Sequence, residues 1–447
     1  MRSAWSPTGM LSALEPLYTA AEMRAAEEGH DVEQLMERAG RAVAEETLQH
    51  YPEARSFAGV FGGGANGGDG RIAAELLRAN GLEEVSLHDA DVVIDALFGT
   101  GFTGEPRPEA AEKIRAINDA PGAVVAVDIP SGVDASTGEI PGDGVLADLT
   151  VTFHARKVGH EVAPGRFYRG ELVVADIGLE PLETEHALVT PEILDLVPRR
   201  SPGDTKYTAG SVLVVGGSPG MTGAVCLTAE AAFRADAGYV AVAAPAESLP
   251  VIEARLLEAV KRPLDKVWDA VERAGALAVG PGLGRERGAL VRRLLDETRL
   301  PAVVDADALW GLEPAEREAP TVLTPHSGEL GRLLGEEAAW VDAHRLKALR
   351  RAVERFECTV LLKGEGTLVG APGRGPLVCG GFPSLATAGT GDVLTGVIGA
   401  FLAKGMEAPF AAAAASVAHT QAAVTAPHKS GLVASDLLLT LPRVLDA

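Results

Sequence analysis

The stretch 57-FAGVFGGGANGGDGRIAAELLRAN-80 carries the pattern of a strand, a tight loop and a helix. Its beginning is an apolar run of strand length, and its end has the spacing of a helix. Between them, Gly62, Gly64 and Gly67 satisfy G-x-G-x-x-G, the spacing that lets a chain turn closely around a phosphate. Asn66 and Asp69 also lie in this loop, where a carboxylate is an unusual neighbour for a pyrophosphate. The stretch therefore predicts a β–loop–α unit and leaves open what the loop binds.

Apolar runs of the same length recur along the chain and alternate with helical patterns. They are rich in Val, Leu and Ile and do not alternate with polar residues, which is typical of parallel strands covered on both faces. The fold class is therefore expected to be α/β. The clearest of these runs are 91–95, 122–128, 211–217, 301–307 and 358–364.

The alternation is interrupted in 191-PEILDLVPRRSPGDTKY-207, where prolines, arginines and a glycine indicate a connector. It then restarts with a second glycine-rich loop, 216-GGSPGMTGA-224. We therefore predict two domains, residues 1–190 and residues 191–447.

The composition narrows the class of protein. A net charge of −22 over 447 residues disfavours nucleic acid and anionic membranes as partners. The three cysteines have no metal-binding spacing, which indicates free thiols in a reducing compartment. The apolar stretches 393–405 and 410–424 are separated by charges and a proline, so they predict two buried helices rather than a membrane span. Without a signal-peptide pattern, these features favour a cytoplasmic protein, whose small, apolar C-terminal helices would suit a homo-oligomer.

Polar residues follow several of the apolar runs. In doubly wound sheets the carboxyl ends of the strands form the ligand crevice, so such residues are candidates for a site. They fall into one group in each half of the chain, which predicts two active sites. The residues are Asp95, Asp128, Asp305, Asp307, His326 and Lys363.

The stretch 386-ATAGTGDVLTGVIGAFLAKG-405 places Asp392 at the start of an apolar helix. Backbone N–H groups of residues 388–391 would form an anion hole there, and Asp392 could take a proton from a substrate hydroxyl. Asp392 could instead only cap the helix, and Asp305 and Asp307 could only cap the turn that follows them. His419, within an alanine-rich helix, has the pattern of a packed core histidine.

The second half of the chain resembles the ribokinase-like superfamily, in which a G-x-G-D motif supplies the anion hole and the catalytic base. The motifs 214-VVGGSPGMTGA-224, 278-AVGPGLG-284, 303-VVDADAL-309, 324-TPHSGEL-330 and 360-VLLKGEGTL-368 lead up to it. Their order is similar to that of one branch, the ADP-dependent dehydratases of hydrated NAD(P)H. The resemblance implies phosphorylation of the hydroxyl at C6 of the hydrated ring, then loss of phosphate, with Mg²⁺ bridging the phosphates of ADP.

This resemblance also implies the roles of individual residues. Asp392 would be the catalytic base, and the hydrated nucleotide would contact it together with Ala224, Gly282, Gly284 and His326. ADP would be held by Lys363, Gly364, Glu365, Gly366, Thr367 and Gly391.

The first half resembles the NAD(P)H-hydrate epimerases, which have a Rossmann-like fold and in bacteria often precede the dehydratase in one chain. The resemblance rests on 35-LMERAG-40, 62-GGGANGGDG-70, 92-VVIDALFGTG-101 and 127-VDIPSGVDASTG-138. It implies that Asp128 transfers a proton during epimerisation and that Asn66, Asp95 and Ser131 bind a potassium ion. Such oxygen donors, without Cys or His, suit a hard cation. The substrate would contact Ala65, Asn66, Gly67, Gly68, Asp69, Gly99, Thr100, Gly101, Phe102, Thr103, Gly104, Glu105 and Asp128.

The first half departs from this family twice. Its loop has Ala65 where the family has an asparagine, and the segment between Gly70 and Asp91 has room for only one helix and one weak strand. The epimerase could therefore be weakened. In the closing segment 153–179, Lys157 and Arg166 could face phosphates or lie on the surface, and Glu37 and Arg38 could form a helix-surface ion pair.

Together these resemblances imply an N-terminal Rossmann-like three-layer domain and a C-terminal ribokinase-like three-layer domain. The first would interconvert the R and S hydrates of NADH and NADPH (NADHX and NADPHX), and the second would dehydrate the S form using ADP, giving AMP and phosphate. Two alternatives remain open. The second domain could be a kinase that makes a stable phosphate ester of a vitamin-like alcohol, and the first could be a non-catalytic nucleotide-binding or scaffold domain.

Overall fold

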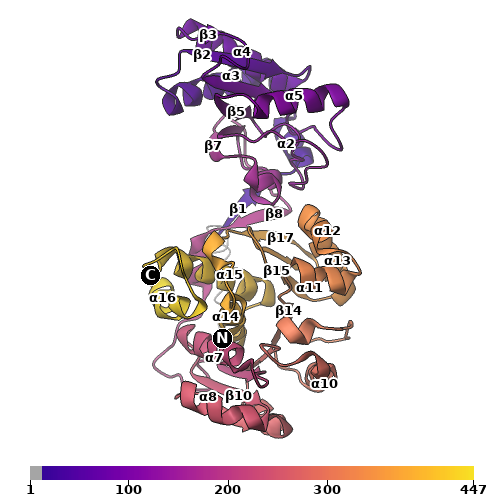
Figure 1. Ribbon diagram of the computed structural model, residues 1–447, viewed down its shortest axis with the longest axis vertical. Coiled ribbons are helices and arrows are strands. Elements are labelled where there is room, and N and C mark those ends of the chain that lie inside the picture. The colour runs from indigo at the N-terminus through magenta and orange to yellow at the C-terminus, as the bar shows by residue number, and fades with distance from the viewer. Residues whose placement is uncertain (1–12, 447) are drawn as a thin grey trace. The chain divides into compact units, whose positions relative to one another are not determined.

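The computed structural model describes residues 13–446, which form two compact units. One consists mainly of residues 16–187 and the other mainly of residues 188–446. Figure 1 shows the first in indigo to magenta and the second in magenta to yellow. None of the helices in the described residues combines the length and hydropathy that crossing a membrane requires.

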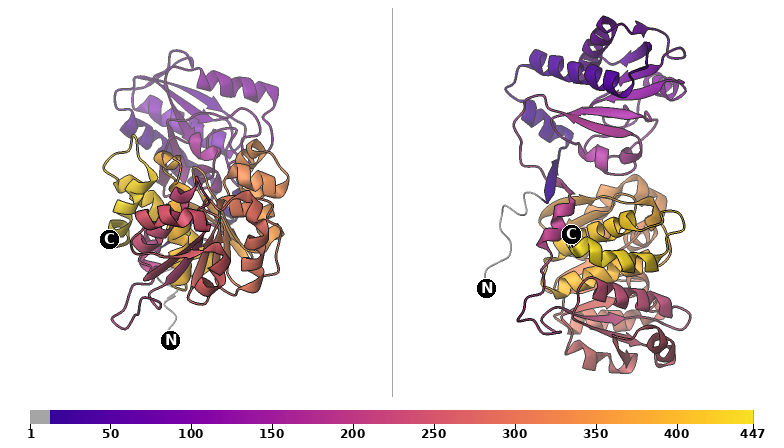
Figure 2. Two further views of the ribbon diagram at one scale, coloured as in Figure 1. Left: turned by 60° about the horizontal axis from the view of Figure 1, so that its bottom comes forward. Right: turned by 90° about the vertical axis from the view of Figure 1, so that its left-hand side faces the viewer.

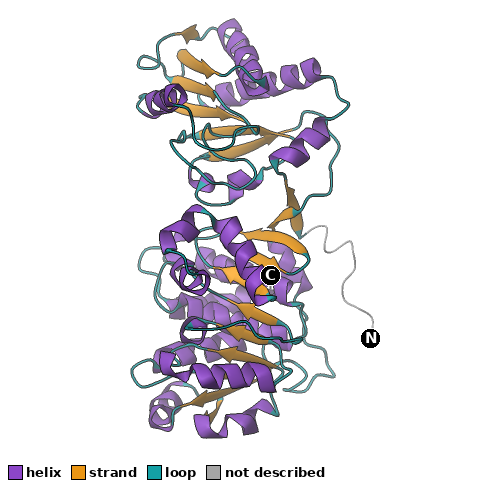
Figure 3. Cartoon of the chain, turned by 90° about the vertical axis from the view of Figure 1, so that its right-hand side faces the viewer, coloured by secondary structure: helices purple, strands orange, loops and turns teal. Residues whose placement is uncertain are grey.

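The first unit is built on a parallel sheet with the strand order β3-β2-β4-β5-β6-β7. The strands β4 and β5 are almost wholly buried, as expected for a sheet covered on both faces (Figure 3). The strands span β2 Ser56–Phe61, β3 Glu83–Glu84, β4 Val92–Ala96, β5 Ala123–Val127, β6 Leu149–Phe153 and β7 Glu171–Ala175.

Two apolar clusters cover the two faces of this sheet. Residues of α3 and α4 pack in one cluster, and residues of α5 pack in the other. The short path from the end of α4 to β4 holds only the two-residue strand β3, which confirms the prediction of one helix and one weak strand there. The helices are α2 Ala20–Glu27, α3 Val32–His50, α4 Ala65–Ala79, α5 Pro108–Asn118 and α6 Val158–Glu161.

The second unit has a larger, mixed sheet in the order β1-β8-β17-β16-β15-β14-β13-β12-β9-β10-β11. It is parallel from β11 to β15, whereas β15, β16 and β17 pair antiparallel. The first strand of the chain, β1, joins this sheet, which the sequence patterns did not predict. The strands span β1 Leu14–Leu17, β8 His186–Val189, β9 Ser211–Val215, β10 Tyr239–Ala244, β11 Val260–Pro263, β12 Ala276–Val279, β13 Ala302–Val304, β14 Thr321–Leu323, β15 Thr359–Leu362, β16 Leu368–Ala371 and β17 Arg374–Cys379.

Helices surround this sheet in all the views of Figure 2. The helix α14 packs against α7 and strands β9, β12 and β13, and α15 lies against β14 to β17. Both are buried, as their apolar patterns predict. The helices are α7 Thr222–Arg234, α8 Leu249–Arg255, α9 Val267–Val271, α10 Gly288–Glu297, α11 Ser327–Leu334, α12 Ala338–Ala343, α13 Arg345–Phe356, α14 Thr390–Ala403, α15 Ala408–Thr425 and α16 Ala434–Asp446.

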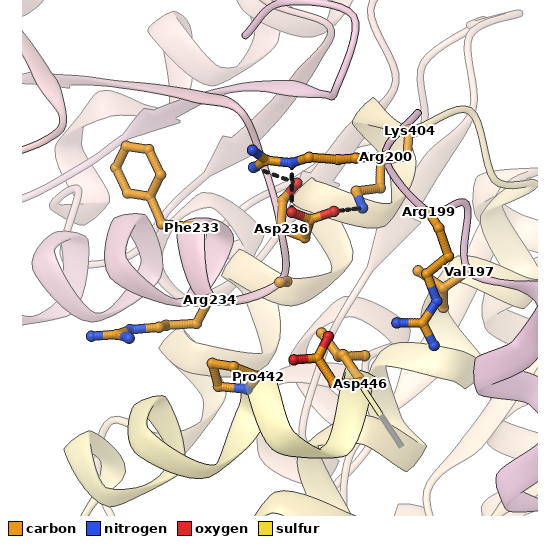
Figure 4. A pocket seen from close by; sticks show the side chains of 11 residues that line it. Val197, Arg199, Arg200, Phe233, Arg234, Asp236, Lys404, Pro442 and Asp446 are labelled. Atoms are coloured by element: carbon orange, nitrogen blue, oxygen red, sulfur yellow. Dashed lines mark hydrogen bonds and ion pairs between the residues drawn. The ribbon is translucent and has the colours of Figure 1, made fainter. Parts of the chain in front are cut away.

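The connector after β8 is fastened to the second unit by one carboxylate, Asp236. Its two oxygens accept from Arg200 Nε and from Lys404 Nζ, each at 2.6 Å, and Lys404 also donates to the carbonyl of Pro198. Figure 4 shows both cations directed at Asp236, at the wall of a cavity of about 450 Å³. These contacts fix the connector where the new run of strands begins.

The glycine-rich loop of residues 62–70 is shorter than its sequence suggests, because α4 begins at Ala65 rather than near residue 71. Close packing explains the glycines inside the helix. A Cβ on Gly67 would lie 2.1 Å from the carbonyl oxygen of Gly62, and one on Gly68 would lie 1.9 Å from Met36 Cε. Asn66 and Asp69 are therefore held in the first turns of a helix.

Candidate active sites

The first site lies where β4 and β5 end. Asp95, at the end of β4, is fully buried, and its carboxylate accepts from the Ser131 backbone N–H at 2.8 Å and from the Ser131 hydroxyl at 2.7 Å. Burial raises the pKa of Asp95 to about 6, although the hydrogen bonds from Ser131 and Leu97 act in the opposite direction. No cationic side chain of the described residues pairs with this carboxylate, so a bound cation would supply the missing positive charge.

Asn66 lies beside the same pair of residues. Its amide nitrogen donates to the carbonyl of Phe98 at 2.8 Å, and the Phe98 N–H in turn donates to the Ser131 hydroxyl at 2.8 Å. This arrangement leaves the amide oxygen of Asn66 facing Gly99, where an added Cβ would lie 3.1 Å away. The predicted potassium ligands Asn66, Asp95 and Ser131 are thus brought together by the structure.

The loop after β4 carries the remaining predicted substrate contacts. A Cβ on Gly99 would lie 2.9 Å from the Cβ of Asn66, and Phe102 stacks on Phe98 with ring centroids 4.6 Å apart. Further along, Thr103 and Glu105 are exposed, and none of the described hydrogen bonds ties their side chains to the site. The structure therefore places the beginning of this loop at the site and leaves its end in solvent.

Asp128 follows β5 and forms a buried ion pair with Lys157. Its backbone adopts a left-handed conformation, with φ at 67°, which turns the side chain toward β6. The Lys157 ammonium donates to the Asp128 carboxylate and to the Thr152 hydroxyl, both at 2.7 Å, and to the carbonyl of Phe153 at 2.9 Å. Lys157 has no exposed surface at all, so a surface role for it is wrong.

The Lys157 pair controls the charge of Asp128. Burial alone would raise the pKa of Asp128, but the ammonium of Lys157 and the Thr152 hydroxyl lower it below its usual value. The neighbouring His160 ring is neutral, because burial and Lys157 lower its pKa to about 3. The carboxylate therefore stays ionised in a buried position. Asp69 is also nearly buried, and burial together with the charges of Asp128 and Glu27 raises its pKa to about 8.

The two other polar residues considered in α3 do not pair with one another. Arg38 donates to the carbonyl of Ile177 at 2.7 Å, and Glu37 approaches Arg41 at 3.3 Å. The ion pair considered between Glu37 and Arg38 is therefore wrong, because Arg38 is used to hold the segment after β7.

The second site lies where β13, β14 and β15 end. Asp305, directly after β13, is buried and accepts from the Lys363 ammonium and from the Thr395 hydroxyl, each at 2.7 Å. Burial would raise the pKa of Asp305, but these two partners and the hydroxyl of Thr324 hold it below its usual value. Asp305 is therefore more than a cap for the turn, and it joins β13 to β15 and to α14.

Asp392 lies in the first turn of α14, after Gly389, whose φ of 89° makes the sharp entry to the helix. Burial and the charge of Asp305 raise the pKa of Asp392 to about 7, although Lys363 lowers it. A Cβ on Gly391 would lie 3.6 Å from the ammonium of Lys363. The helix entrance, Asp392 and the Lys363–Asp305 pair therefore form one cluster.

His326 and Glu329 border this cluster from the start of α11. His326 caps the helix through its ring nitrogen Nδ1, which accepts from the Gly328 N–H at 3.0 Å, and it remains well exposed on its outer side. Glu329 Oε2 lies 3.7 Å from the ammonium of Lys363. His419, in contrast, is packed inside the unit, and burial lowers its pKa to about 4, as expected for a core histidine.

The glycines of the second site bring its loops close to one another. A Cβ on Gly282 would lie 3.4 Å from the Ala224 side chain, and the Gly284 N–H donates to Asp307 at 2.9 Å. The predicted nucleotide loop, residues 363–367, turns around the buried Arg345, which donates to the carbonyl of Gly366 at 3.3 Å.

Both halves of the chain match families of known proteins. The pattern of the NAD(P)H-hydrate dehydratase family matches residues 212–443, and that of the YjeF-related protein N-terminus matches residues 32–88 and 82–159. A bifunctional NAD(P)H-hydrate repair enzyme of Moorella thermoacetica is 36% identical over 92% of both chains. One of Escherichia coli is 35% identical over 92% of this chain and 89% of its own. The chain belongs to the family of bifunctional NAD(P)H-hydrate repair enzymes.

The second unit also resembles a solved structure of an NAD(P)H-hydrate dehydratase. The ADP/ATP-dependent NAD(P)H-hydrate dehydratase of Bacillus subtilis, co-crystallised with ATP and Mg²⁺, matches 57% of this chain and 96% of its own, with 29% identity and a TM-score of 0.53. A ribokinase-like protein of Enterococcus faecalis has a TM-score of 0.53 at 22% identity, which shows the fold alone. The prediction of a ribokinase-like fold for the second unit of this chain is confirmed.

Sequence reasoning missed the partners that set the charge of the site residues. The sequence does not decide the role of Lys157 and does not single out Thr152 or Thr395, although all three lie near the end of a strand or the start of a helix that borders a site. The signal available for Lys157 was its position shortly after the strand 149–153.

Proposed function

We propose that the protein repairs hydrated NADH and NADPH in two steps. Residues 1–190 interconvert the R and S forms at C6, and residues 191–447 remove water from the S form at the expense of ADP, giving AMP and phosphate. The observation that supports this proposal is a buried polar cluster at the strand ends of each unit, in a chain that matches a bifunctional repair enzyme along 92% of its length.

In the second domain, the oxygen of the C6 hydroxyl attacks the terminal phosphorus of ADP. Asp392 takes the proton from this hydroxyl as the bond forms. A base with a pKa near 7 is ionised for about half of the time at neutral pH and can still accept a proton. The backbone N–H groups at the start of α14 face the transferring phosphoryl group. Phosphate then leaves C6 and a proton leaves C5, which restores the double bond of the reduced ring.

The nucleotide is proposed to lie along residues 363–367 and Gly391, with the hydrated substrate at Ala224, Gly282, Gly284 and His326. Lys363, whose pKa is raised by Asp305 and Glu329 against the effect of burial, provides a fixed positive charge beside the phosphates. Asp305 accepts from this ammonium at 2.7 Å and Glu329 lies 3.7 Å from it, so Lys363 already balances carboxylate charge, and Mg²⁺ is proposed to enter with the phosphates of ADP. The ion would neutralise phosphate charge when it is bound.

In the first domain, the potassium ion is proposed to lie at Asn66, Asp95 and Ser131, where Asp95 lacks a cationic partner. Asp128 and residues 65–69 and 99–105 are proposed to hold the hydrated ring, with Asp128 transferring a proton at C6. A scaffold would not need the buried Lys157–Asp128 pair, because replacing both partners of such a pair with apolar residues is often neutral or stabilising.

The test is to incubate the purified protein with the mixed epimers and with ADP, ATP or neither, while absorbance of reduced nicotinamide and free phosphate are followed. The proposal expects both epimers to disappear, with one phosphate released for each reduced nicotinamide. Accumulation of a stable phosphate ester would favour the alternative of a small-molecule kinase. A homo-oligomer and a cytoplasmic location remain proposals from composition, and sedimentation would test the first.

A further inference from the structure

Two buried aspartates of the first unit come from different elements and belong to the substrate contacts proposed for its site. Asp69 lies in α4 and Asp128 follows β5, and each is less than one-tenth exposed. The Asp69 side chain makes no hydrogen bond or ion pair with any described residue, whereas Asp128 is held by Lys157 and Thr152. One carboxyl group is therefore free to meet a ligand, and the other is fixed by a cation behind it.

The surroundings divide the charge between these two groups. Burial and the charges of Asp128 and the more exposed Glu27 raise the pKa of Asp69 to about 8, so Asp69 is protonated at neutral pH. Asp128 faces Lys157 and His160, and its pKa lies below the usual value. A neutral acid and an ionised base in one site are the arrangement that proton transfer in both directions requires.

The chemistry of the proposed substrate needs such a pair. In the hydrate, C6 carries both the ring nitrogen and the added hydroxyl, so the nitrogen lone pair can expel the hydroxyl once that oxygen is protonated. The C6–N bond then becomes an iminium, which is planar at C6. Water can return to either face, and its addition to the opposite face gives the other epimer.

We propose that epimerisation runs by loss and return of water at C6, with Asp69 as the acid and Asp128 as the base. This inference rests on the proposed epimerase function. Asp69 gives its proton to the departing hydroxyl and the C6–O bond breaks, releasing water. A water then forms the new C6–O bond and gives a proton to Asp128. The proton returns from Asp128 to Asp69 through solvent, so no oxidant or reductant is consumed.

Lys157 acts in this scheme as a positioning residue. Its three hydrogen bonds fix the ammonium behind Asp128, so the base is ionised and held in place before the substrate arrives. This scheme explains why an acidic residue lies in the glycine-rich stretch. Asp69 is neutral when it meets the substrate, so it does not repel the substrate's phosphates.

The deciding experiment is epimerisation of the pure R form in water enriched in ¹⁸O, without ADP, using the full chain. The proposal expects one solvent oxygen at C6 in each molecule of S form at the initial rate, above a sample without protein. Retention of the original oxygen would overturn it and would point to opening of the ring, while leaving the epimerase function intact. Absence of any interconversion would instead refute the proposed function.

The variant Asp69→Asn tests the acid directly. It should slow epimerisation by about 10²–10⁴-fold and remove the loss of rate above a pH of about 8, because an amide cannot give up the proton. Glu75→Gln, on the exposed side of the same helix, is the matched control and should change neither. Urea unfolding of the first unit, compared with the parent, shows whether the variant is folded. Equal epimerisation by Asp69→Asn and the parent would overturn the assignment.

Discussion

The two units use the same buried motif for different ends. In each, a lysine ammonium lies 2.7 Å from an aspartate that is also bonded to a threonine hydroxyl, Lys157 with Asp128 and Lys363 with Asp305. In each, a further aspartate nearby has a raised pKa, about 8 for Asp69 and about 7 for Asp392. The two units match different families, and the likeness reflects a shared physical requirement, because a buried carboxylate needs a cation and hydrogen-bond donors.

The difference lies in which aspartate reacts. In the first site the ion pair keeps the proposed base, Asp128, ionised. In the second, burial raises the pKa of the proposed base, Asp392, the paired Asp305 raises it further, and Lys363 lowers it. A buried ion pair can thus either fix the charge of a reacting group or adjust the pKa of its neighbour.

Substitution of Asp392 should affect one activity strongly and leave the other unchanged. Asp392→Asn should slow dehydration by about 10²–10⁴-fold, because the proposed base can no longer accept a proton, and should leave epimerisation unchanged. The measurement is the rate of absorbance recovery from the pure S form with ADP. Asp265→Asn, on the surface of the same unit, is the control. Loss of both activities would contradict two independent sites.

Removing one partner of a buried pair should destabilise the unit that contains it. Lys157→Met leaves the Asp128 carboxylate buried without its cation, which typically costs about 3–5 kcal/mol in the free energy of unfolding. Urea unfolding of the full chain, followed by a probe in each unit, would measure it. Lys113→Met, at an exposed position of α5, should have almost no effect. If both substitutions cost the same, the pair carries no special role.

The rates of the two activities should change with pH in opposite directions. Dehydration requires ionised Asp392, so its rate should fall about tenfold per pH unit as the pH drops below about 7. Epimerisation requires protonated Asp69, so its rate should fall as the pH rises above about 8. Both profiles can be recorded on one preparation from pH 5.5 to about 9.5. Parallel profiles would refute the contrast between the sites.

Potassium should stabilise the first unit alone. At a concentration ten times its dissociation constant, a cation at Asp95 would add about 1.4 kcal/mol to the free energy of unfolding. Thermal unfolding in potassium chloride, compared with choline chloride at equal ionic strength, would detect this. Asp95→Asn should abolish the difference between the salts, and an unchanged difference would place the ion elsewhere.

The smallest expected effect concerns the departure of the loop from its family. Ala65→Asn restores an amide at the start of α4 and should raise the epimerisation rate by about 2- to 10-fold, the value of one hydrogen bond. Steady-state epimerisation of the R form measures it, with dehydration as the internal control. A lower rate would mean that Ala65 is adapted to this site.

Much of the fold was predictable because burial on both faces leaves a continuous apolar pattern. The runs around residues 91–95, 122–128 and 211–217 confirm this, since each contains a buried parallel strand. The start of α4 was predicted wrongly, because glycines that normally end a helix are required there by contacts with Gly62 and Met36. The strand β1 gave no local signal, since its pairing depends on distant chain.

The candidate site residues were predictable to the extent that they end strands. Asp95, Asp128, Asp305 and Lys363 follow this rule, and the structure groups them as two clusters. Their protonation was not predictable. It depends on burial and on partners such as Lys157 and Thr395, which lie far along the chain or on another element.

Two independent sites in one chain are proposed to act in succession, and complementation between two variants tests this succession. Asp128→Asn and Asp392→Asn are purified separately and incubated with the pure R form, ADP and Mg²⁺, while reduced nicotinamide is followed. Each variant alone should convert the R form no faster than its uncatalysed epimerisation allows. Their mixture should restore conversion, because released S form can pass from one variant to the other. If the mixture failed to convert the R form while each variant retained its other activity, the two sites would not act in succession on a released intermediate.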